Sequence, residues 1–281
     1  MYKITEAHRY NASVKRLTIE APLAARRAEA GQFVILRINE RGERIPLTIA
    51  ASDPVNGTVT VIFQEVGRTT TMLGALGVGD SLSDVAGPLG IPSHLDDIKT
   101  ACVIGGGLGC AIAYPQAVAL SAKGAEVDLI AGFRGKDLVF LEGEMTAAGR
   151  SLEICTDDGS YGRKGLVTDA LKGYLDEGRK YDAIIAIGPL VMMKYVCLTA
   201  KPFNVPVMVS MNPIMVDGTG MCGCCRVTVG GQVKFACVDG PDFDGYQVDF
   251  DEAARRNRLY VERERRDMDA HVCKLEGMRH E

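Results

Sequence analysis

Hydrophobic and polar residues follow three different patterns along the chain. In residues 1–97, short runs alternate apolar and polar side chains, as at Leu17 and Ile19 and at Phe33 and Ile35. A period of two is typical of half-buried β-strands. Glycine and asparagine separate the runs at spacings that suit hairpins. We therefore predict a small antiparallel β-barrel in this part of the chain.

Apolar runs alternate with helical patterns in residues 98–209. The predicted buried strands cover residues 101–104, 127–131, 152–155, 183–187 and 205–210. The predicted helices between them cover residues 110–123, 137–148, 167–178 and 190–200. Strands that alternate with helices predict a doubly wound parallel sheet. The expected fold is thus an antiparallel barrel followed by an α/β domain.

The last predicted unit, residues 210–281, begins with a cysteine-rich segment and ends in a polar tail from residue 249. Glutamate and arginine are frequent neighbours in the tail, which is typical of an exposed helix. Two interpretations stay open for its mixed charge. One is a solvated face, and the other is a surface that docks onto another subunit.

Composition narrows the class of protein. Of the 281 residues, 47% are hydrophobic and 24% are charged, the balance of a globular protein. The net charge of −4 comes from 32 basic and 36 acidic residues without a long single-sign block, which does not favour a nucleic-acid partner. The N-terminal residues contain no apolar run behind a basic flank. We therefore expect no signal peptide, no membrane span and a cytoplasmic location.

The distribution of cysteines indicates a metal site. The chain has nine cysteines, and four of them fall between Cys222 and Cys237. In a reducing compartment such a cluster favours metal over disulfides, and thiolates on a glycine-rich loop suit a soft metal or an iron–sulfur cluster. Buried packing positions are predicted for the others, which are Cys102, Cys110, Cys155, Cys197 and Cys273.

A β-hairpin is predicted between two cysteines of this cluster. Apolar and polar residues alternate on both sides of Gly230-Gly231, which is typical of a two-residue turn. The hairpin would return Cys237 to Cys225, so that these two thiolates and that of Cys222 can converge on one site.

A fourth ligand is needed, and Asp217 is the predicted one. It stands five positions before Cys222, where plant-type ferredoxin spacing would place a first cysteine. Cys224 competes for this place, but a ligand directly beside Cys225 would strain the loop, so we take Cys224 as a non-ligand. Zinc held by three cysteines and a fourth group stays open as the alternative.

Two glycine loops are candidates for nucleotide binding. Gly105-Gly106-Gly107-Leu108-Gly109 follows a predicted strand and opens a helix, where backbone amides suit a pyrophosphate. Cys110 stands where a dinucleotide fingerprint needs a third small residue, so a simple tight turn stays open. Gly188-Pro189-Leu190-Val191-Met192 follows a later strand, and Met192 is either a binding or a packing residue.

The motifs together resemble those of a known family. Arg44-Ile45-Pro46-Leu47-Thr48 in the predicted barrel, the two glycine loops and the cysteine segment are similar to ferredoxin-reductase-like electron-transfer subunits. These subunits belong to dihydroorotate dehydrogenase, sulfide dehydrogenase and the electron-bifurcating NADH-dependent ferredoxin:NADP oxidoreductase. The resemblance covers all three regions of the chain. The aspartate in the first ligand position matches the bifurcating branch best.

The resemblance implies roles for residues of the barrel. Arg44 would contact the FAD pyrophosphate and Thr48 the flavin ring, while Pro46-Leu47 replaces the aromatic residue that usually packs on the flavin. A surface salt bridge stays open for Arg44. A helix-opening turn would bind the same pyrophosphate, through the segment Gly67-Arg68-Thr69-Thr70.

The resemblance also implies contacts to the nicotinamide nucleotide. Asp157 lies in a segment that the family places near the nicotinamide, although a hydrogen-bonded turn is an equal interpretation. Arg134 follows the second predicted strand of the sheet and would meet a 2′-phosphate or a ribose, or be structural.

The function implied is that of a flavin oxidoreductase subunit with FAD, a [2Fe–2S] cluster and NAD(H). It would pass electrons between NAD(H) and a larger flavin and iron–sulfur subunit, as a heterodimer or higher assembly, with no nucleic acid or membrane as partner. The alternatives within redox chemistry are subunits of dihydroorotate dehydrogenase, sulfide dehydrogenase or a hydrogenase. An alternative of another class is a non-catalytic nucleotide-binding module with structural zinc.

Overall fold

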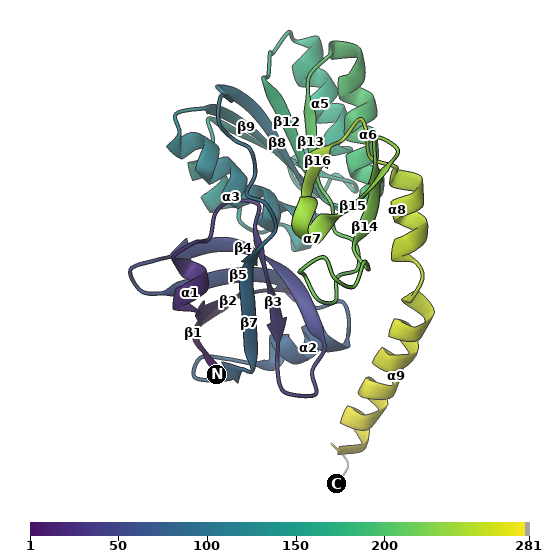
Figure 1. The fold of residues 1–281 in the computed structure, drawn as a ribbon. Coiled ribbons are helices and arrows are strands. Elements are labelled where there is room, and N and C mark those ends of the chain that lie inside the picture. The colour runs from purple at the N-terminus through teal and green to yellow at the C-terminus, as the bar shows by residue number, and fades with distance from the viewer. Residues whose placement is uncertain (279–281) are drawn as a thin grey trace.

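The computed structural model of the chain describes the backbone of residues 1–278 and the side chains of residues 1–270. A β-barrel, a parallel-sheet domain and a cysteine segment follow one another along the chain (Figure 1). The cysteine segment lies beside the junction of the other two parts, and the C-terminal helices run down the outside of the molecule (Figure 1).

The barrel is formed by antiparallel strands in the order β6-β1-β2-β5-β4-β3-β7. Its strands are β1 (Tyr2–Arg9), β2 (Val14–Glu20), β3 (Phe33–Arg37), β4 (Arg44–Asp53), β5 (Thr58–Gln64), β6 (Ser81–Leu82) and β7 (Asp84–Leu89). Two short helices accompany them, α1 (Pro22–Ala25) and α2 (Arg68–Ala75). Apolar side chains such as Leu17, Val61 and Phe63 fill the interior. The predicted antiparallel barrel is confirmed.

Strand β3 departs from the expected half-buried pattern. Val34 and Leu36 point into the barrel core, and Phe33 and Ile35 alternate with them on the outer face. All four side chains are buried. The prediction of a half-buried strand is wrong here, because the cysteine segment packs over the outer face of β3.

The second sheet has the order β11-β10-β9-β8-β12-β13-β16, and all its strand pairs are parallel except the last. Its strands are β8 (Thr100–Gly106), β9 (Glu126–Phe133), β10 (Ser151–Thr156), β11 (Arg163–Lys164), β12 (Ala183–Ile187), β13 (Val207–Ser210) and β16 (Asp242–Asp244). Helices α3 (Gly109–Ala122) and α4 (Glu142–Ala148) share an apolar core with one face of the sheet. Helices α5 (Val167–Asp176) and α6 (Leu190–Ala200) cover the other face, and the short, exposed η2 (Lys201–Phe203) follows α6. The predicted doubly wound sheet is confirmed.

The predicted helix over residues 137–148 is wrong as one element. The structure has a short helix η1 (Lys136–Leu138) and then α4, with Leu141 between them at φ 60°. Phe140 and Leu141 are buried beneath α3, and the chain turns at this point so that both can enter the core.

The C-terminal part contains the predicted hairpin. Its elements are β14 (Arg226–Val229), β15 (Gln232–Phe235), α7 (Ala236–Asp239), α8 (Phe250–Asn257) and α9 (Val261–Met278). β14 and β15 pair antiparallel across Gly230-Gly231, as expected. β16 returns to the large sheet and pairs with β13.

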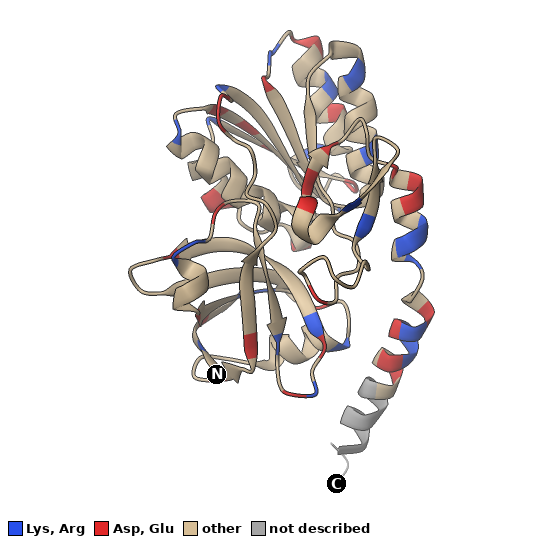
Figure 2. Cartoon of the chain, in the orientation of Figure 1, with Lys and Arg blue, Asp and Glu red and all other residues tan. Residues whose placement is uncertain are grey.

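Helices α8 and α9 confirm a helical polar tail. Basic and acidic residues are interspersed along both helices (Figure 2). α9 lies next to α2 of the barrel. No helix in the described part of the chain is both long and apolar enough to cross a membrane. The side chain of Cys273 lies outside the described residues, and the other cysteines predicted to be scattered in the core are buried.

Candidate functional site

A cavity of about 790 Å³ lies where the three parts of the chain meet. The barrel contributes Phe33, Pro46 and Thr48, and the cysteine segment contributes Met215. The parallel sheet borders the cavity with loops at the carboxyl ends of its strands, the edge at which open α/β sheets bind ligands. The position of the cavity therefore fits a dinucleotide or a flavin.

The first glycine loop forms one wall of the cavity. Gly106, Gly107 and Gly109 line it, whereas Gly105 lies beneath the start of α3. A Cβ atom on Gly109 would overlap the carbonyl oxygen of Ile187, and one on Gly105 would lie 2.7 Å from the Cα of Cys110. These two glycines allow α3 to approach the sheet, so that its N-terminus faces the cavity.

The second glycine loop meets the first through Met192. A Cβ on Gly188 would lie 2.8 Å from the methyl carbon of Met192, and one on Gly106 would overlap its sulfur. Gly188, Pro189 and Met192 all line the cavity. Met192 therefore packs between the two loops, which confirms the packing interpretation, and it also forms part of the cavity wall. A role of Met192 in binding stays a prediction.

Arg134 and Asp157 stand at the same edge of the sheet. Arg134 follows β9 and Asp157 follows β10, and both are exposed side chains that line the cavity. The backbone N–H of Asp157 donates to the carbonyl of Phe133 at 3.0 Å, which ties the two strand ends together. A cation and an anion are thus available to a ligand at this end.

Strand β4 presents alternate residues to the cavity. Pro46 and Thr48 line it, and Leu47 between them packs against the barrel core. This alternation is that of a strand. The structure therefore brings Pro46 and Thr48 to the site and turns Leu47 away from it.

A second group of predicted residues lies at the start of β4 and α2, outside the cavity lining. Thr69 donates its hydroxyl hydrogen to Glu43. The Thr70 hydroxyl oxygen accepts the backbone N–H of Gly67 at 3.0 Å, which caps the N-terminus of α2. Arg44 belongs to this group and extends from β4 to the cysteine segment.

The cysteine site is partly assembled in the structure. The sulfur atoms of Cys225 and Cys237 are 3.2 Å apart and both residues are buried. Burial, together with the neighbouring Cys225 thiol, raises the pKa of Cys237 to about 12. Cys222 is exposed, and its backbone N–H donates to the Asp217 carboxylate at 3.2 Å.

The donor groups of the cysteine segment have the chemistry that an iron–sulfur cluster needs. Among the described residues, no three histidine, cysteine or acidic side chains meet as a metal-binding group. The hairpin nevertheless brings two thiols together, and Asp217 turns its carboxylate towards the backbone of Cys222. Hydrogen bonds, first from the Thr219 hydroxyl and also from Cys222, hold the pKa of Asp217 below its usual range, so the carboxylate is available as an anionic ligand. Thiolate and carboxylate donors suit iron.

Phe33 and Met215 are among the residues of the cavity wall that were not predicted as site residues from the sequence. Phe33 and Met215 line the cavity and also pack in one apolar cluster with Cys225 and Cys237. Phe33 lies in a predicted strand, but its alternation does not indicate what covers its face. Met215 lies in a segment without regular periodicity, so no sequence signal identified it.

Comparisons with known proteins agree with this geometry. Residues 212–249 match the iron–sulfur cluster binding domain of dihydroorotate dehydrogenase B. The chain is 47% identical over 247 residues to a dihydroorotate dehydrogenase B electron transfer subunit homolog of Thermotoga maritima, with 88% of this chain and 87% of the relative covered. It is 35% identical to the electron transfer subunit of Geobacillus thermodenitrificans, covering 83% of this chain and 91% of that one.

A solved structure agrees over almost the whole length. A chain of an NADH-dependent reduced ferredoxin–NADP oxidoreductase matches 97% of this chain and 98% of its own, with 43% identity and a TM-score of 0.92. The ferredoxin-reductase-like fold expected from the sequence is confirmed. The cofactor prediction of FAD, an iron–sulfur cluster and NAD(H) is supported as well. The chain belongs to the family of dihydroorotate dehydrogenase B electron-transfer subunits and their homologues, which are oxidoreductase subunits that act in electron transfer.

Proposed function

We propose that this chain transfers electrons between NAD(H) and a partner subunit through FAD and a [2Fe–2S] cluster. The observation that carries the proposal is the position of Phe33 and Met215. Both side chains border the cavity, and both belong to the apolar cluster that includes the buried Cys225 and Cys237. A cofactor in the cavity and a cluster on the cysteines would thus be linked by packed protein rather than by solvent.

Each of the three parts of the chain would bind a different cofactor. Residues 1–97 would hold the flavin, residues 98–209 the nicotinamide nucleotide, and residues 210–281 the cluster and the C-terminal helices. When bound, FAD exchanges two electrons with a nicotinamide and single electrons with an iron–sulfur cluster.

Each part contributes residues that bind or orient. Pro46 and Thr48 line the cavity on the barrel side, and their proposed ligand is the flavin. The proposed contacts of the FAD pyrophosphate are Arg44, Gly67, Thr69 and Thr70. Leu47 packs into the barrel core behind the flavin side of β4 and would support that strand.

The nucleotide side is lined by the two glycine loops. The proposed contacts there are Gly105, Gly106, Gly107, Gly109, Arg134, Asp157, Gly188, Pro189 and Met192. Open space beside Gly107, which has φ 55°, leaves room for a phosphate close to the backbone. The proposed cluster ligands are Asp217, Cys222, Cys225 and Cys237.

The partner that fits best is a larger subunit with flavin and iron–sulfur cofactors, in a heterodimer. This rests on the similarity over nearly the full length to the NADH-dependent reduced ferredoxin–NADP oxidoreductase chain. A second candidate is the electron-transfer subunit of a dihydroorotate dehydrogenase, favoured by the match of residues 212–249 to that enzyme's cluster-binding domain. Identification of the subunit that copurifies with this chain separates the two.

The cofactors can be tested directly on the purified complex. We expect about one FAD and about two iron atoms to be assigned to this chain, with NADH-dependent reduction of a dye. Stoichiometric zinc without flavin would contradict the proposal and favour a nucleotide-binding module with structural zinc.

The ligand assignment of Asp217 has its own test. Asp217→Cys is expected to retain a cluster but to change its reduction potential and its electron paramagnetic resonance spectrum, because a thiolate replaces a carboxylate at iron. The measurement is a redox titration followed by that spectrum. An unchanged potential and spectrum would contradict the assignment.

A further inference from the structure

Arg44 connects the barrel to the backbone of a proposed cluster ligand. Its Nε donates to the carbonyl oxygen of Val216 at 3.1 Å, and one of its terminal nitrogens donates to the carbonyl oxygen of Asp217 at 3.4 Å. The two acceptors lie 172 and 173 positions further along the chain. The planar guanidinium can reach both carbonyls at once, which a single ammonium group does less well.

The segment that Arg44 contacts is seated closely on the barrel. Gly218 has φ 81°, and a Cβ atom there would lie 2.9 Å from the Cδ1 of Leu89 in β7 and would also crowd Ile35 of β3. Backbone with positive φ favours glycine. Strands β3, β7 and β4 therefore all contact the two residues at the turn, Asp217 and Gly218.

The two ends of Asp217 are held by different parts of the chain. Its carbonyl accepts from Arg44, while its carboxylate accepts the Thr219 hydroxyl and the backbone N–H groups of Thr219 and Cys222. The carboxylate contacts are local to the loop. The contact from Arg44 is the one of these that sets the loop relative to the barrel.

We propose that Arg44 is a positioning residue of the cluster site, which holds the backbone of Asp217 from the same strand that presents Pro46 and Thr48 to the cavity. This inference rests on the proposed function, since it assumes that Asp217 ligates the cluster. Residues 44, 46 and 48 share one face of β4 because strand residues alternate. Arg44 thereby places the ligand loop in a constant position relative to the flavin side of the cavity.

Because Arg44 is charged, the proposal can be tested through the reduction potential of the cluster as well as through the rate at which the cluster loses iron. Reduction adds negative charge to a cluster, so a cation beside the ligand backbone stabilises the reduced form and raises the potential. Because Arg44 is also a proposed contact of the FAD pyrophosphate, Arg44→Gln is expected to lower flavin content, as Thr48→Val does, and in addition to lower the cluster potential. It should also release cluster iron to a chelator about threefold faster, because the two hydrogen bonds to the carbonyls of Val216 and Asp217 are lost and each contributes little while exposed to water.

Arg44→Lys separates charge from geometry. A lysine retains the positive charge but cannot bond both carbonyls with a planar fork, so we expect the potential to remain near that of the unaltered complex and iron release to be faster. If Arg44→Gln fails to fold, the iron release of Arg44→Lys alone tests whether Arg44 positions the loop.

Two matched variants act as controls. Arg41→Gln removes a cation from the exposed turn before β4 and should leave the potential and the iron release unchanged. Thr48→Val alters the proposed flavin contact on the same strand face without touching the loop, so it should lower flavin content and leave the cluster spectrum unchanged.

Redox titration, paramagnetic resonance and chelator release are measured on the complex together with its flavin and iron content. A cluster potential and iron release in both Arg44 variants equal to those of the unaltered complex would overturn the inference while leaving the proposed function intact. An equal change in Thr48→Val would also overturn it, because the effect would then pass through the flavin. Absence of an iron–sulfur signal in the unaltered complex would overturn both proposals.

Discussion

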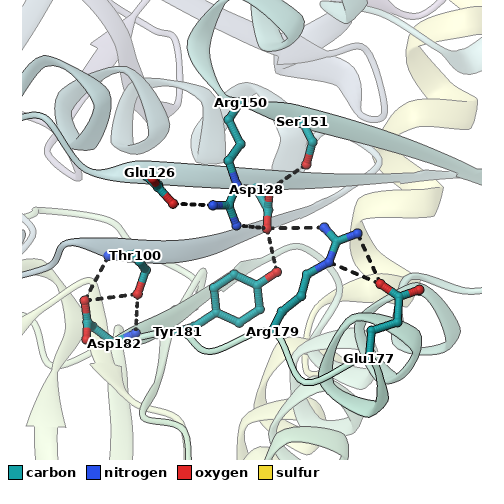
Figure 3. A network of polar contacts seen from close by, with 9 residues as sticks. All are labelled: Thr100, Glu126, Asp128, Arg150, Ser151, Glu177, Arg179, Tyr181 and Asp182. Atoms are coloured by element: carbon teal, nitrogen blue, oxygen red, sulfur yellow. Dashed lines mark hydrogen bonds and ion pairs between the residues drawn. The ribbon is translucent and has the colours of Figure 1, made fainter.

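The two edges of the parallel sheet are built from opposite chemistry. At the carboxyl edge, β8 and β12 lead into glycines, β9 contains Gly132 near its end, and all three border the cavity. At the amino edge, the same strands begin among charged and hydroxyl side chains that bond to one another (Figure 3). At the carboxyl edge, glycines leave space beside the exposed side chains of Arg134 and Asp157, whereas at the amino edge the polar side chains bond to one another.

Asp128 is the centre of the amino edge. Its side chain is fully buried, and Arg150 donates to both of its carboxylate oxygens, at 2.9 and 2.8 Å. Tyr181 donates at 2.7 Å and Ser151 at 2.6 Å, while Arg179 lies 3.4 Å away. A buried carboxylate is tolerated where its hydrogen bonds are complete.

A second carboxylate ties neighbouring strands at the same edge. Asp182, just before β12, accepts the backbone N–H of Thr100 at the start of β8 at 2.8 Å (Figure 3). It also accepts the backbone N–H of Lys99 at 2.9 Å. The comparison teaches that hydrogen bonds and ion pairs at the amino edge stabilise this sheet, while the carboxyl edge remains accessible to ligands.

The largest effect is expected from breaking the amino edge. Asp128→Ala should destabilise the protein by about 3 kcal/mol, because Arg150, Tyr181 and Arg179 lose a buried anionic partner, although the two arginines still reach water. Urea unfolding of this chain within its complex measures the change.

A surface carboxylate provides the matched control for Asp128→Ala. Asp176→Ala removes an exposed helix pair with Lys172 and should cost less than about 0.5 kcal/mol. The proposed difference between the two edges is contradicted if Asp128→Ala and Asp176→Ala lower the free energy of unfolding equally. It is also contradicted if Asp128→Ala lowers nucleotide affinity and leaves the free energy of unfolding unchanged.

An intermediate effect is expected at the carboxyl edge. Gly109→Ala should cost about 2 kcal/mol and weaken nucleotide binding about tenfold, because the new methyl group overlaps the Ile187 carbonyl and displaces the start of α3. Titration of the complex with NADH measures the affinity.

Gly143→Ala is the control variant. Gly143 lies on α4 with nothing within 4 Å of the new Cβ, so this variant should leave the affinity unchanged. Equal affinity in both variants would show that close approach of α3 is not required.

The smallest effect is expected from acid. Burial alone would raise the pKa of Asp128, but hydrogen bonds from Arg150, Ser151 and Tyr181 outweigh it and hold the pKa well below the usual range. The unfolded carboxyl titrates near its ordinary pKa of about 3.9. Because the folded pKa is lower, this stabilisation is complete above about pH 4 and is lost as the pH falls further.

The acid effect is measured as the dependence of the urea midpoint on pH between about 5 and 3, followed by circular dichroism. Asp128→Asn should show less loss of stability over this range, by about 1 kcal/mol. A steeper loss in the variant would mean that other carboxylates govern the acid sensitivity.

Much of the fold could be predicted because its signals are local. The strands around Val103 and Ile130, the helix that ends near Gly124, and the hairpin across Gly230-Gly231 each follow from periodicity and turn residues. The two glycine loops were predicted as candidates for nucleotide binding because both follow buried strands, and residues of both line the cavity. The break at Leu141 was not predicted, because the local pattern of residues 137–148 is helical. The helix is interrupted so that Phe140 and Leu141 can enter the core, and the sequence does not show where that core lies.

By itself, the sequence determined the order of the elements, the glycine loops and the return of Cys237 to Cys225, because backbone periodicity and short-range chain geometry decide these. Only the tertiary structure decided that the cysteine segment covers β3, that Met192 fills the space between two loops, and that Arg44 reaches Asp217. These contacts join residues far apart in the chain. They depend on which surfaces meet, and no local pattern carries that information.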